Sequence, residues 1–194
     1  MWNKKSIKIQ VEVSARHCHL SENDLFVLFG KNHELKSLKQ LSQPSEFACQ
    51  ETVEIEFGSK KISNVRVVGP AREKSQVEIS ITDSMGSGIT PIIRLSGHIE
   101  NSSPVLLRGP EGVVKLNEGL IVAKRHIHCA TEEAIKLGLK NGDSVSVKID
   151  GERPVIFEDV IVRVKNGYSL SMHLDTDEGN ACGINKIGKG EIIK

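Results

Sequence analysis

Aromatic side chains are scarce in this sequence of 194 residues, where they make up 4%. Proteins that bind single-stranded nucleic acid stack the bases on such rings, so the scarcity disfavours a base-stacking platform. An excess of one charge is also missing, because 26 Lys and Arg against 25 Asp and Glu leave a formal net charge of +1. A near-neutral chain has no electrostatic footprint for a polyanion, and we expect no nucleic-acid partner.

Long apolar runs and paired cysteines are missing as well. No run approaches the roughly 18 apolar residues that span a membrane, and no apolar core of a secretory signal follows Met1–Lys5. The four cysteines are scattered without a C-x-x-C pair, which favours reduced thiols and a cytoplasmic location. The length allows one domain or two small ones and excludes an eight-unit α/β barrel of about 250 residues.

What the chain does have is a series of short segments in which apolar and polar residues alternate. Because side chains on a strand point alternately to its two faces, such segments predict half-buried strands. They lie at residues 7–13, 52–57, 62–68, 76–82, 144–149 and 155–164. Many short strands punctuated by Gly, Pro, Asn and Asp predict a mainly β fold built as small barrels.

Helices and turns are predicted to be short. Helical segments over residues 22–29, 132–137 and 177–181 would begin after the N-caps Ser21, Thr131 and either Asp175 or Thr176. The pair Asn166-Gly167 predicts a β-hairpin turn, because both residues tolerate a positive φ. Residues 95–119 are rich in Gly, Ser and Pro and are predicted to form loops.

One motif occurs twice. Arg16-His17-Cys18-His19 and Arg125-His126-Ile127-His128 each follow an apolar segment and precede a short predicted helix. Alternate residues of an extended chain point to one side, so the two histidines of each copy can converge on one point. Imidazole is a common ligand for zinc and similar metals, and the duplication therefore predicts two metal-binding pairs. The cysteines inside and after the motifs, Cys18 and Cys129, would face the core.

A catalytic zinc ion usually has three protein ligands, so each pair needs a third partner. Glu78 is one candidate, because it lies on the face of its predicted strand opposite Val77 and Ile79. His173, on a segment of alternating residues, is the other candidate. The alternatives are that Glu78 is a solvated strand residue and that His173 is a structural histidine. The remaining histidines, His33 and His98, lie in polar surroundings and are assigned no role.

Arg72 lies in the turn that leads to Glu78. Its planar guanidinium could hold a phosphate or a carboxylate through two parallel hydrogen bonds. An arginine in such a turn could equally be a surface residue. The segment Gly188-Lys189-Gly190 is not a phosphate loop, because no helix can follow it before the end of the sequence.

Taken together, four motifs resemble the PduL-type phosphate acyltransferases, also called phosphate propanoyltransferases. They are residues 13–21, residues 69–72 with 76–78, residues 125–128 and residues 173–180. The resemblance covers nearly the whole chain. It implies a mainly β fold of two small, pseudo-symmetric β-barrels capped by short helices, with the metal site in the cleft between them. We expect barrel 1 to contain residues 1–45 and 119–194 with both Arg-His-x-His motifs, and barrel 2 to contain residues 46–118 with Arg72 and Glu78.

The resemblance also implies an activity, namely the reversible transfer of a propanoyl or acetyl group between coenzyme A and inorganic phosphate. The products would be acyl phosphate and free coenzyme A. Two zinc ions are implied, one on His17, His19 and Glu78 and the other on His126, His128 and His173. Arg72 would be the catalytic residue that holds phosphate. Coenzyme A would contact Val13, Ser14, Ala15, Lys60, Arg66 and Asn180, although the family commonly has Asn where Ala15 stands.

A direct attack of phosphate on the thioester, assisted by zinc, needs no enzyme nucleophile, and no Ser-His-Asp or Cys-His arrangement is evident. The alternatives are a zinc-dependent hydrolase that uses the same ligands with water as nucleophile, and a metal-storage or metal-stabilised binding module. The resemblance implies acyl-CoA and phosphate as partners, a homodimer and a role in propanediol degradation. Members of the family from bacterial microcompartments carry an N-terminal extension that is missing here, which favours the cytoplasm, with co-packaging as the alternative.

Overall fold

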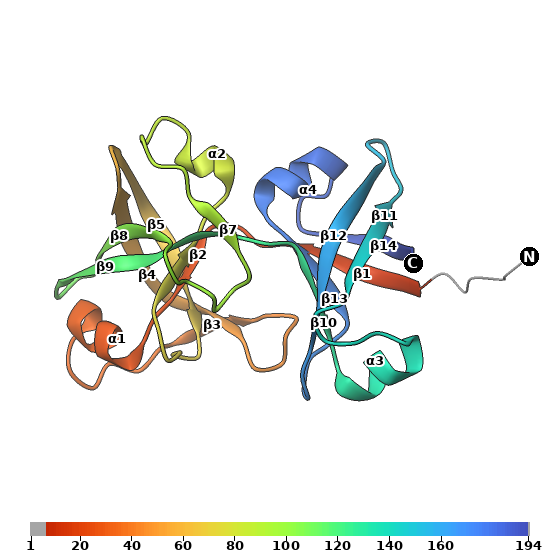
Figure 1. Cartoon of the computed structure of the whole chain (residues 1–194). Helices are drawn as coiled ribbons and strands as arrows, with labels where there is room; N and C mark the ends of the chain where they lie inside the picture. Colours follow the sequence, from red (N-terminus) through yellow and green to blue (C-terminus); the bar gives the residue numbers. More distant parts are fainter. Residues whose placement is uncertain (1–6, 194) are drawn as a thin grey trace, which may run out of the picture. The chain divides into compact units, whose positions relative to one another are not determined.

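The computed structural model describes residues 7–193. The chain divides into two compact units (Figure 1). Unit 1 combines the described parts of Met1–Ser14 and Lys124–Lys194, and unit 2 is the continuous segment Ala15–Ala123. Within residues 7–193 no helix is long and apolar enough to cross a membrane. The prediction of a missing signal peptide concerns residues that lie partly outside the described part.

Unit 1 is a closed barrel of six strands with two short helices. In order around the barrel the strands are β1 (Ile7–Val13), β13 (Ser171–Leu174), β10 (His126–Cys129), β12 (Val155–Val164), β11 (Ser144–Ile149) and β14 (Ile187–Ile193). The helices are α3 (Thr131–Leu137) and α4 (Thr176–Cys182). Alternate residues of the strands fill the interior, among them the fully buried Val11, Ile127 and Met172. The polar residues between them face outward, as the period of two requires.

Unit 2 contains the remaining eight strands. They are β2 (His17–His19), β3 (Ser37–Gln40), β4 (Phe47–Phe57), β5 (Lys60–Gly69), β6 (Gln76–Glu78), β7 (Ile92–Arg94), β8 (Ser103–Arg108) and β9 (Val113–Ala123). Six of them pair in the closed ring β4-β5-β2-β6-β9-β8, and β3 and β7 extend it beside β4 and β9. The helices are α1 (Glu22–Phe29) and α2 (Ile81–Ser84). The ring encloses a second core that includes Ile55, Leu107 and Leu120. Two six-stranded barrels with a few short helices therefore confirm the predicted mainly β fold of two small barrels.

The two barrels repeat one pattern of strand pairing. β2 pairs parallel with β5 and antiparallel with β6, and β10 pairs in the same way with β12 and β13. The correspondence continues around both rings, so that β4, β8 and β9 match β11, β14 and β1. The duplicated motif is thus part of a duplicated barrel, which confirms the predicted pseudo-symmetry.

The strands that complete the two barrels are arranged differently along the chain. In unit 2, β8 and β9 are consecutive and antiparallel. In unit 1 the equivalent strands are β14 and β1, the last and the first strands of residues 7–193, with Ile7 opposite Ile192. β1 leads into β2 of unit 2, and β9 leads into β10 of unit 1. The chain therefore passes from one unit to the other twice.

This connectivity corrects the predicted domain boundaries. Residues 15–45 belong to unit 2, not to the barrel that holds the chain ends, because β2 pairs with β5 and β6. The two Arg-His-x-His motifs therefore lie in different units, one in each. Residues 119–123 belong to unit 2 as the end of β9, which pairs with β6, β7 and β8.

Several local predictions were wrong for physical reasons. Residues 95–119 include β8 and most of β9, whose apolar residues pack into the core of unit 2. The turn at Asn166-Gly167 does not join a paired hairpin, because β10 lies between β12 and β13. The strand predicted over residues 76–82 ends at Glu78, since Ser80 caps α2. The helix predicted after Thr131 begins one residue earlier, with Ala130 at its N-cap and no side-chain cap.

Candidate functional site

Four polar side chains lie together where β2 and β6 pair. The antiparallel register places His17 opposite Glu78 and His19 opposite Gln76. The residues between them, Cys18 and Val77, are fully buried in the core of unit 2. Because neighbouring residues of a strand face opposite sides, the four polar residues share the other face of the two strands.

The groups that could bind a metal converge within this patch. Nε2 of His17 is 3.5 Å from Oε2 of Glu78, and Nε2 of His19 is 3.9 Å from Oε1 of the same carboxylate. The three residues offer ligand atoms that all lie within 4.8 Å of one another. His19 and Glu78 are buried and His17 is half-buried. Two imidazoles and a carboxylate form a donor set that suits zinc and similar divalent metals.

The other ring nitrogens indicate which atoms would bind the metal. Nδ1 of His17 lies 2.8 Å from the carbonyl oxygen of Ala15, and Nδ1 of His19 lies 3.1 Å from that of Val68. A carbonyl oxygen only accepts hydrogen bonds, so Nδ1 of each neutral ring carries the proton and Nε2 keeps its lone pair. Outer hydrogen bonds of this kind are typical of metal-binding histidines. The cluster therefore fits a metal ion bound through both Nε2 atoms and Glu78.

The charges of this cluster suit a cation. Burial by itself would raise the pKa of Glu78, but His17, His19, a hydrogen bond from Ser96 and the charge of Arg72 outweigh it and lower that pKa to about 2. Burial, helped by His17 and Arg72, lowers the pKa of His19 well below its usual value. At neutral pH the carboxylate is thus ionised and His19 is neutral, which are the protonation states that metal ligands require.

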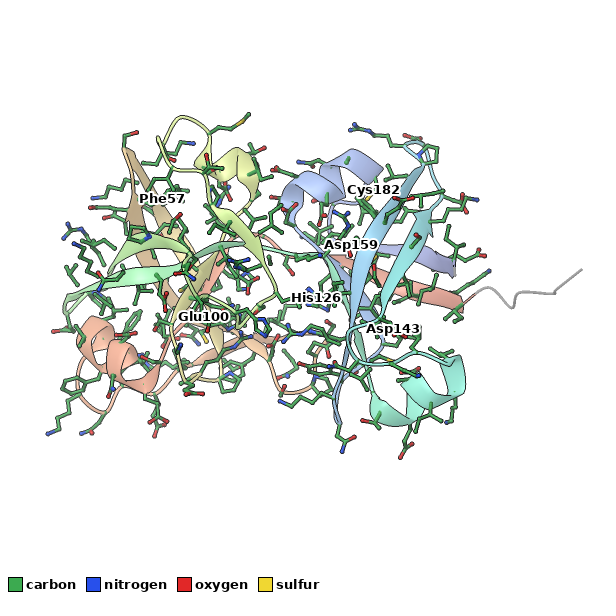
Figure 2. The ribbon with its side chains drawn as sticks, in the orientation of Figure 1. Phe57, Glu100, His126, Asp143, Asp159 and Cys182 are labelled. Carbon is green, nitrogen blue, oxygen red and sulfur yellow. The ribbon has the colours of Figure 1, made fainter. Side chains whose placement is uncertain are left out.

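Unit 1 holds the corresponding group of three histidines at β10 and β13. His126, labelled in Figure 2, lies opposite His173 in the strand register, and His128 lies opposite Ser171. The ring centres of His126 and His128 are 4.7 Å apart, those of His128 and His173 are 4.7 Å apart, and those of His126 and His173 are 5.4 Å apart. Nδ1 of His126 lies 2.9 Å from the carbonyl oxygen of Lys124, as His17 does with Ala15. His173 therefore takes the position that Glu78 has in unit 2.

The arginine of each motif forms an ion pair at the equivalent place in its unit. Arg16 donates from Nε and Nη2 to Oδ1 of Asp83, at 2.9 and 2.6 Å. Arg125 donates from Nη1 to Oε1 of Glu178 at 2.9 Å. Asp83 and Glu178 are the third residues of α2 and α4, where each also closes a capping box. Each arginine thus links the start of a His-x-His strand to a helix. Arg16 is linked to α2, which follows the strand of Glu78, and Arg125 to α4, which follows the strand of His173.

Arg72 lies close to the cluster of unit 2. Its backbone N–H donates to the carbonyl oxygen of Leu20, one residue beyond the His-x-His strand. Its side chain donates from Nη1 to Oγ of Ser96 at 3.1 Å and from Nη2 to Oε1 of Glu46 at 2.8 Å. The side chain is 30% exposed, so it is not fully shielded from solvent. Its charge lowers the pKa of both His19 and Glu78, which shows that the three groups are electrostatically coupled.

Two of the residues predicted to contact coenzyme A, Lys60 and Arg66, lie on β5 of unit 2. Arg66 lies next to His17 in the register of β5 and β2, and it donates to the carbonyl oxygens of Cys49 and Gln50. Lys60 lies at the other end of β5, about 20 Å along the strand, and donates to the carbonyl oxygen of Asp83. Arg66 therefore lies beside the cluster of unit 2, whereas Lys60 contacts α2, whose Asp83 pairs with Arg16.

Three of the other predicted contacts, Val13, Ser14 and Ala15, form the first connection between the units. Val13 ends β1, and the N–H of Ser14 donates to the carbonyl oxygen of Leu174. Ala15, which begins unit 2, supplies the carbonyl that faces His17. Asn180 is an exposed residue of α4 in unit 1.

Two polar residues at the site were not predicted. Gln76 is 2% exposed and Ser96 is 8% exposed, and both lie between Glu78 and Arg72 in the hydrogen-bond network. The alternation along residues 76–82 does place Gln76 on the face of Glu78, so that signal was present in the sequence. Ser96 comes from a segment predicted as a loop, where no pattern marks it. His33 lies outside both groups, with Nε2 2.8 Å from Oε1 of Glu51.

Comparisons with known proteins agree with these observations. The family model for phosphate propanoyltransferase matches residues 10–185. The phosphate propanoyltransferase of Sebaldella termitidis is 45% identical over 96% of this chain and 89% of its own length. The proteins of the same name from Leptotrichia buccalis and Thermotoga maritima are 46% and 44% identical, over 98% and 94% of this chain and 90% and 87% of their own lengths. The chain therefore belongs to the phosphate propanoyltransferase family and is an acyltransferase.

Proposed function

We propose that this protein transfers a short acyl group reversibly between coenzyme A and inorganic phosphate, with two zinc ions as cofactors. The observation that carries the metal part is the convergence of His17, His19 and Glu78, whose ligand atoms lie within 4.8 Å of one another. His126, His128 and His173 would hold the second ion, since they occupy the equivalent strands of unit 1. A bound zinc ion supplies Lewis acidity, which can polarise a thioester carbonyl or stabilise a thiolate leaving group.

Arg72 would hold and orient the phosphate. A guanidinium held by Ser96 at Nη1 and by Glu46 at Nη2 keeps further N–H groups for an anion. Two parallel hydrogen bonds would set the direction of a phosphate. In the forward reaction a phosphate oxygen attacks the thioester carbon, the carbon–sulfur bond breaks, and the sulfur leaves as the thiolate of coenzyme A. No side chain needs to carry the acyl group in this scheme, so an acyl group trapped covalently on the protein during turnover would refute direct attack.

The position of Arg66 supports coenzyme A as a substrate. Arg66 lies beside His17, and its charge suits the phosphate groups of the coenzyme. Val13, Ser14, Ala15, Lys60 and Asn180 complete the proposed contacts. The acyl group would be propanoyl, as the family name implies, or acetyl. A homodimer, a cytoplasmic location and a link to microcompartments stay predictions.

One assay tests the proposed function. Propanoyl-CoA or acetyl-CoA is mixed with the protein, and free thiol is followed with and without phosphate and with and without a chelator. Thiol release that needs both phosphate and metal, with acyl phosphate as the product, is the expected result. Release without phosphate would indicate the thioester hydrolase instead.

The cysteines of the protein are not expected to contribute to the free thiol measured in that assay. Cys18, Cys49 and Cys129 are fully buried, and Cys182 is 4% exposed. Burial, helped by Glu51, raises the pKa of Cys49 to about 11, and burial also raises those of the other three thiols. Because the thiolate is the reactive form, a thiol reagent such as Ellman's reagent should find no reactive cysteine in the folded protein at pH 8 and four after denaturation. Rapid reaction of the native protein would contradict this burial.

A further inference from the structure

We propose that Gln76 and Ser96 are positioning residues that link the metal-binding carboxylate of Glu78 to the phosphate-binding guanidinium of Arg72. The proposal rests on the proposed function and adds to it how the two binding groups are held. The three hydrogen bonds that connect these four side chains are here called the relay. In these bonds Nε2 of Gln76 donates to Glu78 and to Ser96, and Nη1 of Arg72 donates to Ser96.

The first part of the relay fixes the carboxylate. Nε2 of Gln76 donates to Oε1 of Glu78 at 2.6 Å, and Oε1 of Gln76 accepts from the N–H of Gly97 at 2.8 Å. The N–H of Gly97 can only donate, so the amide of Gln76 has one orientation, with its NH₂ group toward Glu78. This bond holds Oε1 of Glu78 and leaves Oε2 facing Nε2 of His17, at 3.5 Å.

The second part of the relay fixes the guanidinium. Oγ of Ser96 accepts from Nε2 of Gln76 at 2.8 Å and from Nη1 of Arg72 at 3.1 Å. One hydroxyl therefore contacts the amide of Gln76 and the guanidinium of Arg72 at once. Buried networks of this kind restrict each member to one arrangement.

The burial of the relay distinguishes it from ordinary surface bonding. Gln76 and Ser96 are 2% and 8% exposed, so neither can exchange its partners freely for water. Gln76 also has an equivalent in unit 1, because Ser171 stands two residues before His173 and contacts its Nε2 at 3.0 Å. In both units the residue two positions before the third candidate ligand supports that ligand from the same face of the strand.

The test uses Gln76→Met, which keeps the volume but removes the amide, and Ser96→Ala, which removes the hydroxyl. Zinc affinity is measured by titrating the metal-free protein with Zn²⁺ against a competing chelator, following the binding step that Glu78→Gln removes. Gln76→Met should weaken this step 10- to 100-fold, the usual effect of losing an outer partner of a ligand. Ser96→Ala should raise the KM for phosphate about tenfold with kcat within about twofold, since it removes one of the two side-chain hydrogen bonds that hold Arg72, the other being to Glu46.

A matched control separates positioning from stability. Ser102 is equally buried in unit 2, where Oγ donates to the carbonyl oxygen of Ile99 and accepts from the N–H of Gly119, away from the relay. Ser102→Ala should lower the unfolding temperature without changing zinc affinity or the KM for phosphate. Ser96→Thr, which keeps a hydroxyl, should restore the KM toward that of the unsubstituted protein. In the double variant, the changes that Gln76→Met and Ser96→Ala each cause in zinc affinity should not add, and neither should the changes in the KM for phosphate, because the two residues act in one network.

Two results would overturn the relay. One is that Gln76→Met and Ser96→Ala change zinc affinity and the KM for phosphate no more than Ser102→Ala does. The other is that their effects simply add. If the unsubstituted protein shows no turnover that depends on phosphate, the proposed function fails, and the zinc titrations of the single and double variants still decide whether the relay holds Glu78.

Discussion

Glu78→Gln is expected to lower phosphate-dependent thiol release by more than about a hundredfold and to remove the metal from the cluster on β2 and β6. The amide keeps the shape of the side chain but offers a neutral oxygen in place of an ionised carboxylate, whose pKa is lowered to about 2. His17 and His19 alone are then two ligands, too few for a stable zinc site. Activity and the zinc content of the purified protein are the two measurements.

The control for this prediction is Glu54→Gln, on β4 of the same unit. Glu54 is a more exposed glutamate whose ion pair with Lys61 is a surface contact, and such pairs contribute little. Glu54→Gln should leave both activity and zinc content unchanged. Full activity of Glu78→Gln with normal zinc content would refute the assignment of Glu78 as a metal ligand. Full activity of the unsubstituted protein after complete removal of metal would refute a catalytic role for zinc altogether.

Arg72→Lys should raise the KM for phosphate about 10- to 100-fold and leave the KM for acyl-CoA within about threefold. Charge-assisted hydrogen bonds contribute about 1.5–3 kcal/mol, and a lysine cannot reproduce the planar fork that binds a phosphate through two bonds. Arg72→Ala should act in the same direction and at least as strongly. Initial rates over a range of phosphate concentrations at saturating acyl-CoA measure the effect.

Arg108→Ala is the matched control, because it removes one positive charge from an exposed arginine of unit 2 that pairs with Glu56. It should not change the KM for phosphate beyond about twofold. If Arg72→Ala keeps full turnover and consumes no phosphate, the enzyme is a hydrolase and water is the nucleophile. Equal effects of Arg72→Ala and Arg108→Ala on the KM for phosphate would mean that phosphate responds only to the overall positive potential of the protein.

The sequence predicted what depends on local pattern. The two His-x-His copies lie on strands as expected, because alternation along an extended chain is a local property. Helix α1 has the predicted bounds and cap, since Ser21 accepts from the backbone of Asp24. The predicted group of His17, His19 and Glu78 does converge, because Glu78 also lies on the predicted face of its strand.

The parts that were missed depend on contacts between distant segments. β2 joins residues 15–45 to unit 2 only through its pairing with β5 and β6, and nothing near residue 45 signals where the barrel ends. Ser96 reaches Gln76 and Arg72 from a separate segment, so its role depends on tertiary folding. The resemblance to a family supplied site residues but no bonds between them, and the relay became visible only in the structure.

In unit 1, β1 pairs with β13 and β14, which follow unit 2 in the sequence. This pairing has a consequence for synthesis on the ribosome. β1 is made before unit 2, but its partners β13 and β14 are made after it. Unit 2 is continuous, so its core can form as soon as β9 has left the ribosome. During that time the apolar residues of β1, such as Ile9 and Val11, have no sheet to join, and pairing across so long a separation is slow. The nascent chain should therefore fold unit 2 before unit 1, with β1 as the segment most exposed to chaperones and to aggregation.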